Sequence, residues 1–178
     1  MKIYQTTVAS PLGDLTLACD GARLTGLWIA GQKYFGLPLV NSETVKGINC
    51  PVFQETEAWL NTYFSGALPP SLPPLAPAGS PFRQAVWKLL LEIPRGTVTT
   101  YGELSRTLRS RGIGASPQAV GGAVAHNPIS ILIPCHRVVG SGGSLTGYAG
   151  GLEKKRFLLE LEGVDMAGLY TPPRGTAL

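Results

Sequence analysis

Two residues that are adjacent in the sequence, Cys135 and His136, are the best candidates for covalent chemistry. The chain has only three cysteines and two histidines, so the pair brings two scarce reactive groups together directly after Pro134. A cysteine becomes a nucleophile when an imidazole or a hydrogen-bonded relay stabilises its thiolate. Successive side chains on a strand point to opposite faces, whereas a turn at Pro134 would let His136 reach the sulfur, directly or through one water. The pair predicts a nucleophile with its base, and the alternative is an inert buried cysteine.

The remaining cysteines indicate neither a disulfide framework nor a metal site. Cys19, Cys50 and Cys135 are odd in number and widely spaced, and His126 and His136 add no zinc-like spacing. No apolar segment approaches the ~18 residues of a membrane helix, and the first ten residues lack the apolar run of a signal peptide. We therefore expect a soluble protein in a reducing, cytoplasmic compartment, without a membrane partner, a metal or another cofactor.

Charge is unevenly distributed along the chain, whose net charge is +4. Residues 1–79 carry four basic and five acidic side chains, whereas residues 80–178 carry eleven basic and six acidic ones. A basic half indicates a polyanionic partner, and a solvated basic face without a partner is the alternative.

The first 68 residues are expected to form a small α/β domain. Short apolar segments separated by turn sequences predict an antiparallel β-meander over residues 2–30. Aromatic and leucine residues at helical spacing predict one helix that ends at Gly66, whereas residues 31–50 show no clear period. Six prolines between 69 and 81 then predict an extended connection over residues 69–79.

Residues 80–168 are expected to form a helical domain, followed by a tail at 169–178 whose last residues, TPPRGTAL, are expected to be frayed. Helices are predicted to begin after Ser80, after Thr100, where Glu103 completes a capping box, and after Ser116. The apolar residues 129–134 follow the third helix and read as a strand, which predicts a helix-turn-helix with a wing. A last helix is predicted over LEKKRFLLELEG.

The third of these helices carries unusually small side chains. Its sequence QAVGGAVAH contains two consecutive glycines, and a glycine costs a helix interior up to ~1 kcal/mol relative to alanine. Close approach of another backbone would explain such a sequence. That backbone belongs either to a neighbouring helix or to a nucleic acid whose groove receives the helix.

Beyond the cysteine pair, the chain from Asn127 to Gly151 reads NPISILIPCHRVVGSGGSLTGYAGG, and here it resembles the O6-alkylguanine-DNA alkyltransferases. The family hallmark P-C-H-R-V is present as residues 134–138. The resemblance is close over residues 80–163 and loose in the first domain, through SPLGDLTLA and YFSG. It implies an α/β protein of the α+β type, with a ribonuclease-H-like N-terminal domain and a C-terminal winged helix-turn-helix domain.

The resemblance also implies a mechanism. Cys135 would accept the alkyl group from guanine O6 in one displacement, and the stable thioether would limit each molecule to a single reaction. His136 would act as the base through a bridging water, and Glu162 would orient its imidazole. Asn127 would tie the third helix to the turn that carries the cysteine.

The implied partner is double-stranded DNA that contains O6-alkylguanine, bound through its minor groove by a monomer, which would be nucleoid-associated in a prokaryote. Activity on O4-alkylthymine is left open. Tyr101 would rotate the nucleotide, the carbonyls of Cys135 and Val138 would read the guanine amine, and phosphates would contact Arg137 and further basic residues. The residues expected to contact DNA or the flipped base are Tyr101, Gln118, Gly121, Gly122, Ala123, Arg137, Val138, Tyr148, Ala149 and Gly150. The further phosphate contacts are Lys88, Arg95, Arg106, Arg109 and Arg111.

The sequence departs from the family pattern at Gln118, where family members usually have an arginine that fills the space left by the flipped base. We expect slower or more salt-sensitive repair of duplex DNA as a result. The basic loop 106–115 is also longer than usual. Three other functions are compatible with parts of the pattern: an alkyltransferase-like protein that binds lesions without repair, which Cys135 argues against, a winged-helix regulator with a redox-sensing cysteine, and a cysteine hydrolase.

Overall fold

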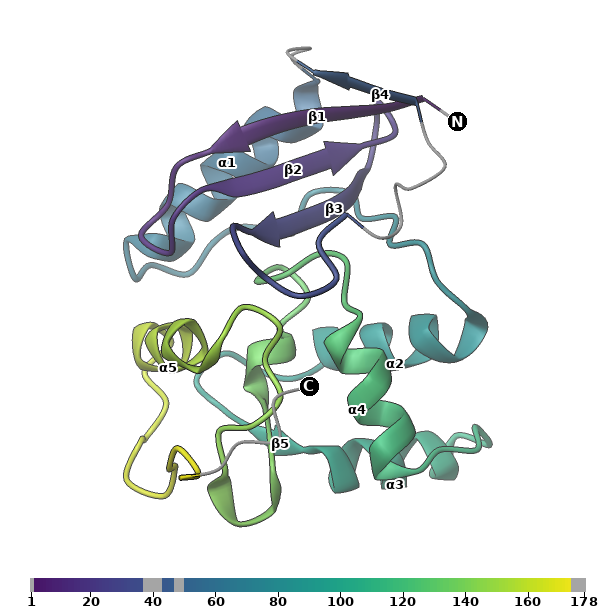
Figure 1. Cartoon of the computed structure of the whole chain (residues 1–178), viewed down its shortest axis with the longest axis vertical. Helices are drawn as coiled ribbons and strands as arrows, with labels where there is room; N and C mark the ends of the chain where they lie inside the picture. The colour runs from purple at the N-terminus through teal and green to yellow at the C-terminus, as the bar shows by residue number, and fades with distance from the viewer. Residues whose placement is uncertain (1, 37–42, 47–49, 174–178) are drawn as a thin grey trace. The chain divides into compact units, whose positions relative to one another are not determined.

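The computed structural model describes residues 2–36, 43–46 and 50–173, which form two compact units (Figure 1). The first unit comprises Met1–Ala78 and Pro128–Leu132, and the second comprises Gly79–Asn127 and Ile133–Leu178. The chain therefore leaves the second unit after Asn127 and returns to it at Ile133. The sequence predicted a second domain over residues 80–168, and Pro128–Leu132 is the part of that range that packs with the first unit.

The first unit is a four-stranded sheet with one helix, α1, along a face of it (Figure 1). The strand order is β3-β2-β1-β4, in which β1, β2 and β3 pair antiparallel and β4 pairs parallel with β1. The predicted meander and helix are confirmed, whereas β4 lies in the stretch that shows no sequence period. The elements are β1 (Lys2–Val8), β2 (Leu15–Cys19), β3 (Leu24–Ile29), β4 (Glu43–Lys46) and α1 (Pro51–Phe64).

The interior of this sheet is organised around Trp28. Its ring lies over Gly26, where an added Cβ would fall 1.9 Å from a ring carbon, so a side chain at this position would displace the indole. Ile3 and Ala18 are fully buried with Trp28 in one cluster. On β2 and β3, the alternation of buried and exposed residues gives way to nearly continuous burial.

The proline-rich stretch over residues 69–79 is not a free connection. Leu24 in β3 donates its N–H to the carbonyl of Pro74 at 2.8 Å and accepts from the N–H of Ala76 at 2.7 Å. A proline lacks the N–H that a central strand needs, but it is tolerated at the edge of a sheet. The stretch therefore extends the first unit by an irregular edge segment.

The segment Pro128–Leu132 pairs with the same strand. Leu27 donates its N–H to the carbonyl of Pro128 at 2.8 Å and accepts from the N–H of Ser130 at 2.9 Å. Ile131 then turns the chain with a φ of 72°. No strand forms over residues 129–134, so the expected wing at this position is wrong. The apolar side chains of this stretch are instead buried in irregular backbone, and the bridge with Leu27 leads back to β3.

The second unit contains four helices and two short parallel strands among its described residues. Predicted helix starts are confirmed in the hydrogen bonds that cap them: Ser80 accepts from the N–H of Arg83, and Thr100 forms the reciprocal capping box with Glu103. The elements are α2 (Pro81–Leu91), β5 (Thr99–Thr100), α3 (Tyr101–Ser110), α4 (Pro117–Ala125), the 3₁₀ turns η2 (Cys135–Arg137) and η3 (Ser141–Gly143), β6 (Val138–Val139) and α5 (Leu152–Leu161).

The chain after α5 folds back onto the loop that precedes it. Tyr170 donates its N–H to the carbonyl of Gly143 at 3.1 Å and accepts from the N–H of Leu145 at 2.8 Å. An added Cβ on Gly143 would lie 2.0 Å from the carbonyl oxygen of Gly168, so the two backbones touch. Leu169 packs against the same apolar cluster as Leu145. The first two residues of the predicted tail are thus packed on this loop. The segment expected to be frayed begins after them, at Thr171, and its residues 174–178 lie outside the described residues.

Candidate active site

Cys135 begins a single 3₁₀ turn that follows Pro134. The N–H of Cys135 donates to the carbonyl of Ile133 at 2.8 Å, and the N–H of Arg137 donates to that of Pro134 at 3.1 Å. The predicted break of the apolar run at Pro134 is thus confirmed, as a short helix. The turn buries both reactive side chains, because Cys135 is 5% exposed and His136 is 0% exposed.

Asn127 connects the end of α4 to this turn. Its backbone N–H donates to the carbonyl of Val124 at 3.2 Å, just after the helix. Its side-chain amide donates to the carbonyl of Ile133 at 2.8 Å and to Cys135 Sγ at 3.1 Å. A hydrogen bond to sulfur stabilises the thiolate more than the thiol. The amide therefore holds the nucleophile in place and favours its reactive form.

The imidazole of His136 is paired with a carboxylate at the end of α5. His136 Nε2 lies 2.8 Å from Glu162 Oε1, and both side chains are fully buried. An ionised carboxylate only accepts hydrogen bonds, so Nε2 carries the proton. In the neutral ring, Nδ1 then holds a lone pair, and it makes no hydrogen bond with any described residue. Burial lowers the pKa of His136 despite the opposing effect of Glu162, so the neutral ring is favoured.

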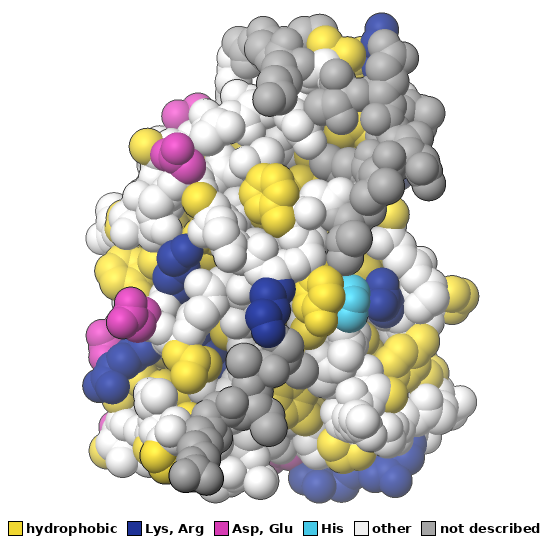
Figure 2. Space-filling model, viewed as in Figure 1, with side chains coloured by type: hydrophobic (Ala, Val, Ile, Leu, Met, Phe, Trp, Pro, Cys, Tyr) yellow, Lys and Arg dark blue, Asp and Glu magenta, His cyan; other side chains and the backbone are white. Residues whose placement is uncertain are grey.

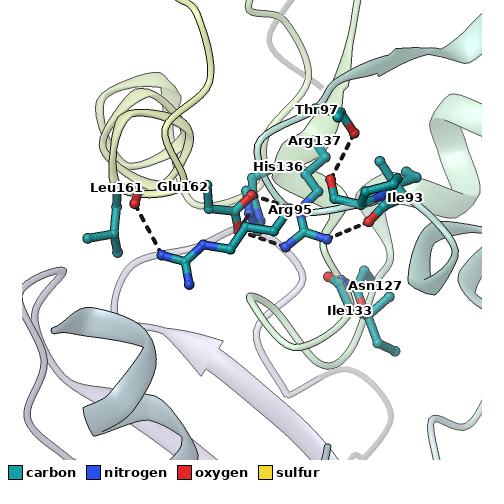
Figure 3. Close-up of polar contacts among 10 residues, drawn as sticks. Ile93, Arg95, Thr97, Asn127, Ile133, His136, Arg137, Leu161 and Glu162 are labelled. Atoms are coloured by element: carbon teal, nitrogen blue, oxygen red, sulfur yellow. Dashed lines mark hydrogen bonds and ion pairs between the residues drawn. The ribbon is translucent and has the colours of Figure 1, made fainter. Parts of the chain in front are cut away.

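Arg137 points inward and binds the same carboxylate (Figure 3). Its Nε donates to Glu162 Oε2 at 2.7 Å and its Nη2 donates to Oε1 at 2.9 Å, while Nη1 donates to the carbonyl of Ile93 at 2.6 Å. Its side chain is only 13% exposed. The interpretation of Arg137 as a phosphate contact is therefore wrong, because its guanidinium is already bonded inside the unit.

The two partners together keep Glu162 ionised. Burial alone would raise the pKa of this carboxyl, but hydrogen bonds from His136 and Arg137 outweigh burial and lower the pKa far below its ordinary value. Glu162 is thus a fixed acceptor at neutral pH.

A second buried cation, Lys155 in α5, lies near the sulfur and was not anticipated. Lys155 is 0% exposed, and its Nζ donates to the carbonyls of Val138 at 2.6 Å and Thr146 at 2.7 Å. Burial lowers the pKa of Lys155 to about 8. The signal in the sequence was its spacing, because Lys155 stands three or four residues from Leu152 and Leu159 and so shares their inward stripe.

The Cys135 thiol experiences opposing effects. Burial raises its pKa, whereas the Asn127 hydrogen bond, the charge of Lys155 and nearby backbone N–H groups lower it. The balance leaves the pKa raised. The thiol therefore keeps its proton at neutral pH until a base removes it, and His136 is the nearest residue in sequence with a lone pair for that purpose.

The loop over residues 146–151 lies beside these groups. The hydroxyl of Tyr101 donates to the carbonyls of Thr146 at 3.3 Å and Gly147 at 3.4 Å. The ring of Tyr148 meets the imidazole of His136 edge-on, with centroids 6.5 Å apart. Gly147 and Gly151 adopt φ angles of 76° and 95°, which glycine tolerates best. Ala149 and Gly150 are half-buried between them.

The exposed face of α4 is nearly free of side chains. Gln118 is exposed, an added Cβ on Gly122 would meet nothing within 4 Å, and one on Gly121 would touch only the ring of Tyr101, at 3.8 Å. Ala123 is different, because it is 3% exposed and its carbonyl accepts from Trp87 Nε1 at 2.9 Å. The inclusion of Ala123 among the DNA contacts is therefore wrong: it packs against α2.

The basic residues proposed for phosphate contacts fall into two groups. Arg111 pairs with Glu92 at 2.7 Å and Arg95 donates to the carbonyl of Leu161 at 3.3 Å, so both have protein partners. Three others are exposed, namely Lys88, Arg106 and Arg109. Figure 2 shows Lys and Arg side chains gathered where Figure 1 labels α3.

Two functions are not indicated by the described part of the chain. None of its His, Cys, Asp and Glu side chains form a group of three or more that could hold a metal ion. None of its helices is both long and apolar enough to cross a membrane.

Together, fold and site define a class of protein in which a helical unit carries a buried cysteine next to a buried His–Glu pair. Residues 81–164 match the family model of the 6-O-methylguanine DNA methyltransferase DNA-binding domain, and residues 3–77 match that of its ribonuclease-like domain. The chain belongs to the 6-O-methylguanine DNA methyltransferase family.

Named relatives agree with this assignment. The methylated-DNA–protein-cysteine methyltransferase of Haemophilus influenzae is 42% identical over 97% of this chain and 94% of that protein. The protein of the same name from Mycobacterium tuberculosis is 43% identical over 90% of this chain and 92% of its own length. The crystal structure of Mycobacterium tuberculosis OGT in complex with DNA gives a TM-score of 0.75 at 40% identity and covers 92% of this chain and 93% of that one.

Proposed function

We propose that this chain repairs DNA directly by moving an alkyl group from guanine O6 to Cys135 Sγ. The observation that carries the proposal is the buried Cys135 thiol, hydrogen-bonded by Asn127 and adjacent in sequence to an imidazole that Glu162 orients. The membership in the methyltransferase family supports the same chemistry.

The proposed reaction is a single displacement. The thiol proton passes to Nδ1 of His136, directly or through a water, as the sulfur attacks the alkyl carbon. A carbon–sulfur bond forms while the carbon–oxygen bond breaks, and its electron pair remains on the guanine. The guanine anion takes up a proton from solvent and remains in the DNA as repaired guanine, while His136 releases the thiol proton to solvent. No oxidant or reductant is consumed, and because the thioether is stable, each molecule reacts once.

DNA is proposed to bind through the minor groove, with α4 inserted as the reading helix. The open face at Gly122 supports this, because a backbone can approach the helix closely there. An alkyl carbon inside a duplex is out of reach of a buried sulfur, so the nucleotide must be flipped out, at a cost of roughly a few kcal/mol. Gln118, which is exposed near the start of α4, is proposed to fill the space in the base stack that the flipped nucleotide leaves.

The base itself is proposed to lie between the turn at Cys135 and the 146–151 loop. The carbonyls of Cys135 and Val138 accept from the guanine amine, and Tyr148, Ala149 and Gly150 form the cover. Each carbonyl oxygen has two lone pairs, so the bond that Val138 already accepts from Lys155 leaves one for the base. O4-alkylthymine is proposed as a second, poorer substrate, because its transferable group is also an O-alkyl group.

We also propose that the protein acts as a monomer in the cytoplasm, near the nucleoid if the cell is prokaryotic. All three cysteines are free thiols, which suits a reducing compartment.

The test is transfer of label from duplex DNA that carries O6-[methyl-labelled] guanine. Label should appear on the protein in a one-to-one ratio, be lost in Cys135→Ala, and persist in the control variant Cys50→Ala. Repeated turnover would identify a hydrolase instead. Binding without transfer would identify a lesion-binding protein or a regulator.

A further inference from the structure

Arg137 binds the carboxylate that orients His136, and the displacement proposed above gives Arg137 no role. The guanidinium binds both oxygens of Glu162, and the oxygen that accepts from Nη2, Oε1, is the one that also accepts from His136 Nε2 (Figure 3). Because both oxygens are bound from fixed directions, the carboxylate has no freedom to rotate away from the imidazole.

We propose that Arg137 is a positioning residue for alkyl transfer: it fixes the Glu162 carboxylate, which in turn keeps the proton of His136 on Nε2 and leaves Nδ1 free to accept the thiol proton. The proposal rests on the proposed roles of Cys135 and His136. In this proposal Arg137 acts on Glu162 and His136, and not on the DNA phosphates that the sequence suggested.

The guanidinium is itself anchored, so it can impose a position. Its third nitrogen, Nη1, donates to the carbonyl of Ile93, two residues beyond the end of α2. A cation is favoured near the carbonyl end of a helix. Arg137 therefore links three segments: the end of α2, the turn with the nucleophile, and the end of α5.

The backbone of Glu162 lies against the turn that follows α2. Gly96 adopts a φ of 80°, and an added Cβ there would lie 3.2 Å from the carbonyl oxygen of Glu162. Arg95 donates to the carbonyl of the preceding residue, Leu161. Residues 95 and 96 thus contact the backbone at Leu161 and Glu162, and Arg137, which is bonded to Ile93, contacts the Glu162 carboxylate.

The charges around His136 explain why an arginine is required. Lys155 faces it from α5, Glu162 from the residue after that helix, Arg137 from its own turn, and Tyr148 from the loop; Cys135 is its neighbour in sequence. The Arg137 charge opposes protonation of the ring. Without Arg137, the buried carboxylate loses the cation that neutralises it and attracts a proton onto the imidazole more strongly. Protonation of Nδ1 would remove the lone pair that accepts the thiol proton.

The experiment measures single-turnover methyl transfer at saturating protein, from about pH 5 to about pH 9, for wild type, Arg137→Gln and Arg137→Lys. We expect Arg137→Gln to slow transfer by about tenfold near neutral pH and to move the acid limb of the profile to higher pH. Arg137→Lys should recover part of the rate, because it restores the charge but not the bidentate contact. Glu162→Gln should move the acid limb in the opposite direction, to lower pH.

The matched control is Arg156→Gln, which breaks an exposed Arg156–Glu160 pair of the same chemistry on α5, at 2.8 Å. It should leave rate and profile unchanged. The proposal is overturned if Arg137→Gln keeps the wild-type rate and pH profile, or if it weakens DNA binding while the saturated rate is unchanged, as a phosphate contact would.

A second measurement keeps the test valid if Arg137→Gln does not fold. Nitrogen NMR shifts of His136 in folded wild type and Arg137→Lys report which ring nitrogen carries the proton. We expect Nε2 protonation in wild type, and protonation of both nitrogens at a higher pH in the variant. Identical titrations would overturn the proposal even if wild type failed to transfer methyl, an outcome that would refute only the proposed function.

Discussion

The side-chain amide of Asn127 donates at once to Cys135 Sγ, at 3.1 Å, and to the carbonyl of Ile133, at 2.8 Å. The two hydrogen bonds use both N–H groups of the amide and so fix its orientation toward the sulfur. The end of α4, which is proposed to lie in DNA, is thereby connected to the nucleophile through a single residue.

Replacement of Asn127 should impair the nucleophile directly. A hydrogen bond to a charged group contributes about 1.5–3 kcal/mol, so Asn127→Ala should slow methyl transfer by about 10- to 100-fold. Single-turnover kinetics check this, with Asn61→Ala on the exposed face of α1 as the control. An unchanged rate for folded Asn127→Ala would show that the amide serves only to close the turn.

The charge of Lys155 should lower the pKa of the Cys135 thiol and so increase its reactivity. Its charge lowers the pKa of Cys135, so Lys155→Met should raise that pKa and slow alkylation of the thiol by iodoacetamide. The measurement is the pH dependence of this reaction without DNA, which allows the exposed Lys88→Met as the control. A profile that matches wild type in folded Lys155→Met would refute the electrostatic effect.

Gln118→Arg should improve repair of duplex DNA. A cationic side chain entering the stack also attracts the surrounding phosphates, so we expect a several-fold faster transfer and tighter binding at physiological salt. A short single-stranded substrate, which has no stack to fill, should show a smaller gain. Equal duplex rates and affinities for the two proteins would show that the glutamine is an adequate substitute.

The buried pair His136 and Glu162 should make the folded protein sensitive to acid. Both folded-state pKa values are lowered, so the unfolded chain binds more protons and the free energy of unfolding falls as the pH decreases. The loss should begin below about pH 6.5 through His136 and continue below about pH 4.3 through Glu162.

Urea unfolding at several pH values measures this loss. Glu162→Gln should flatten the lower part of the curve, and His136→Gln the upper part, whereas the exposed Glu160→Gln should change neither. If all four curves had the same slope, the acid sensitivity would arise elsewhere.

The features that the sequence predicted well depend on short-range chemistry. Helix starts at Ser80, Thr100 and Ser116 are visible because the capping side chain lies within three residues of the N–H it binds. The break at Pro134 is likewise a property of one residue.

The features that the sequence missed depend on partners distant in the chain. Arg137 looked like a surface cation because its acceptors, Glu162 and Ile93, lie 25 and 44 residues away. The wing was predicted from the apolar residues 129–134. Their pattern does not reveal which strand they will pair with, and here Ile129 forms a bridge with Leu27 in β3. Lys155 was overlooked because charged residues are rarely buried without a partner, and its partners are backbone carbonyls.

The burial of Cys135 also protects it from premature loss. A sulfur that reacts only once is wasted if peroxide or a dissolved methylating agent consumes it first. Because Cys135 is 5% exposed and its pKa is raised, we expect this thiol to react slowly with such solutes, and under the proposed function a flipped nucleotide brings the alkyl carbon within its reach. Under the proposed function, we therefore expect the number of active molecules to decrease with the lesions repaired rather than with the age of the protein.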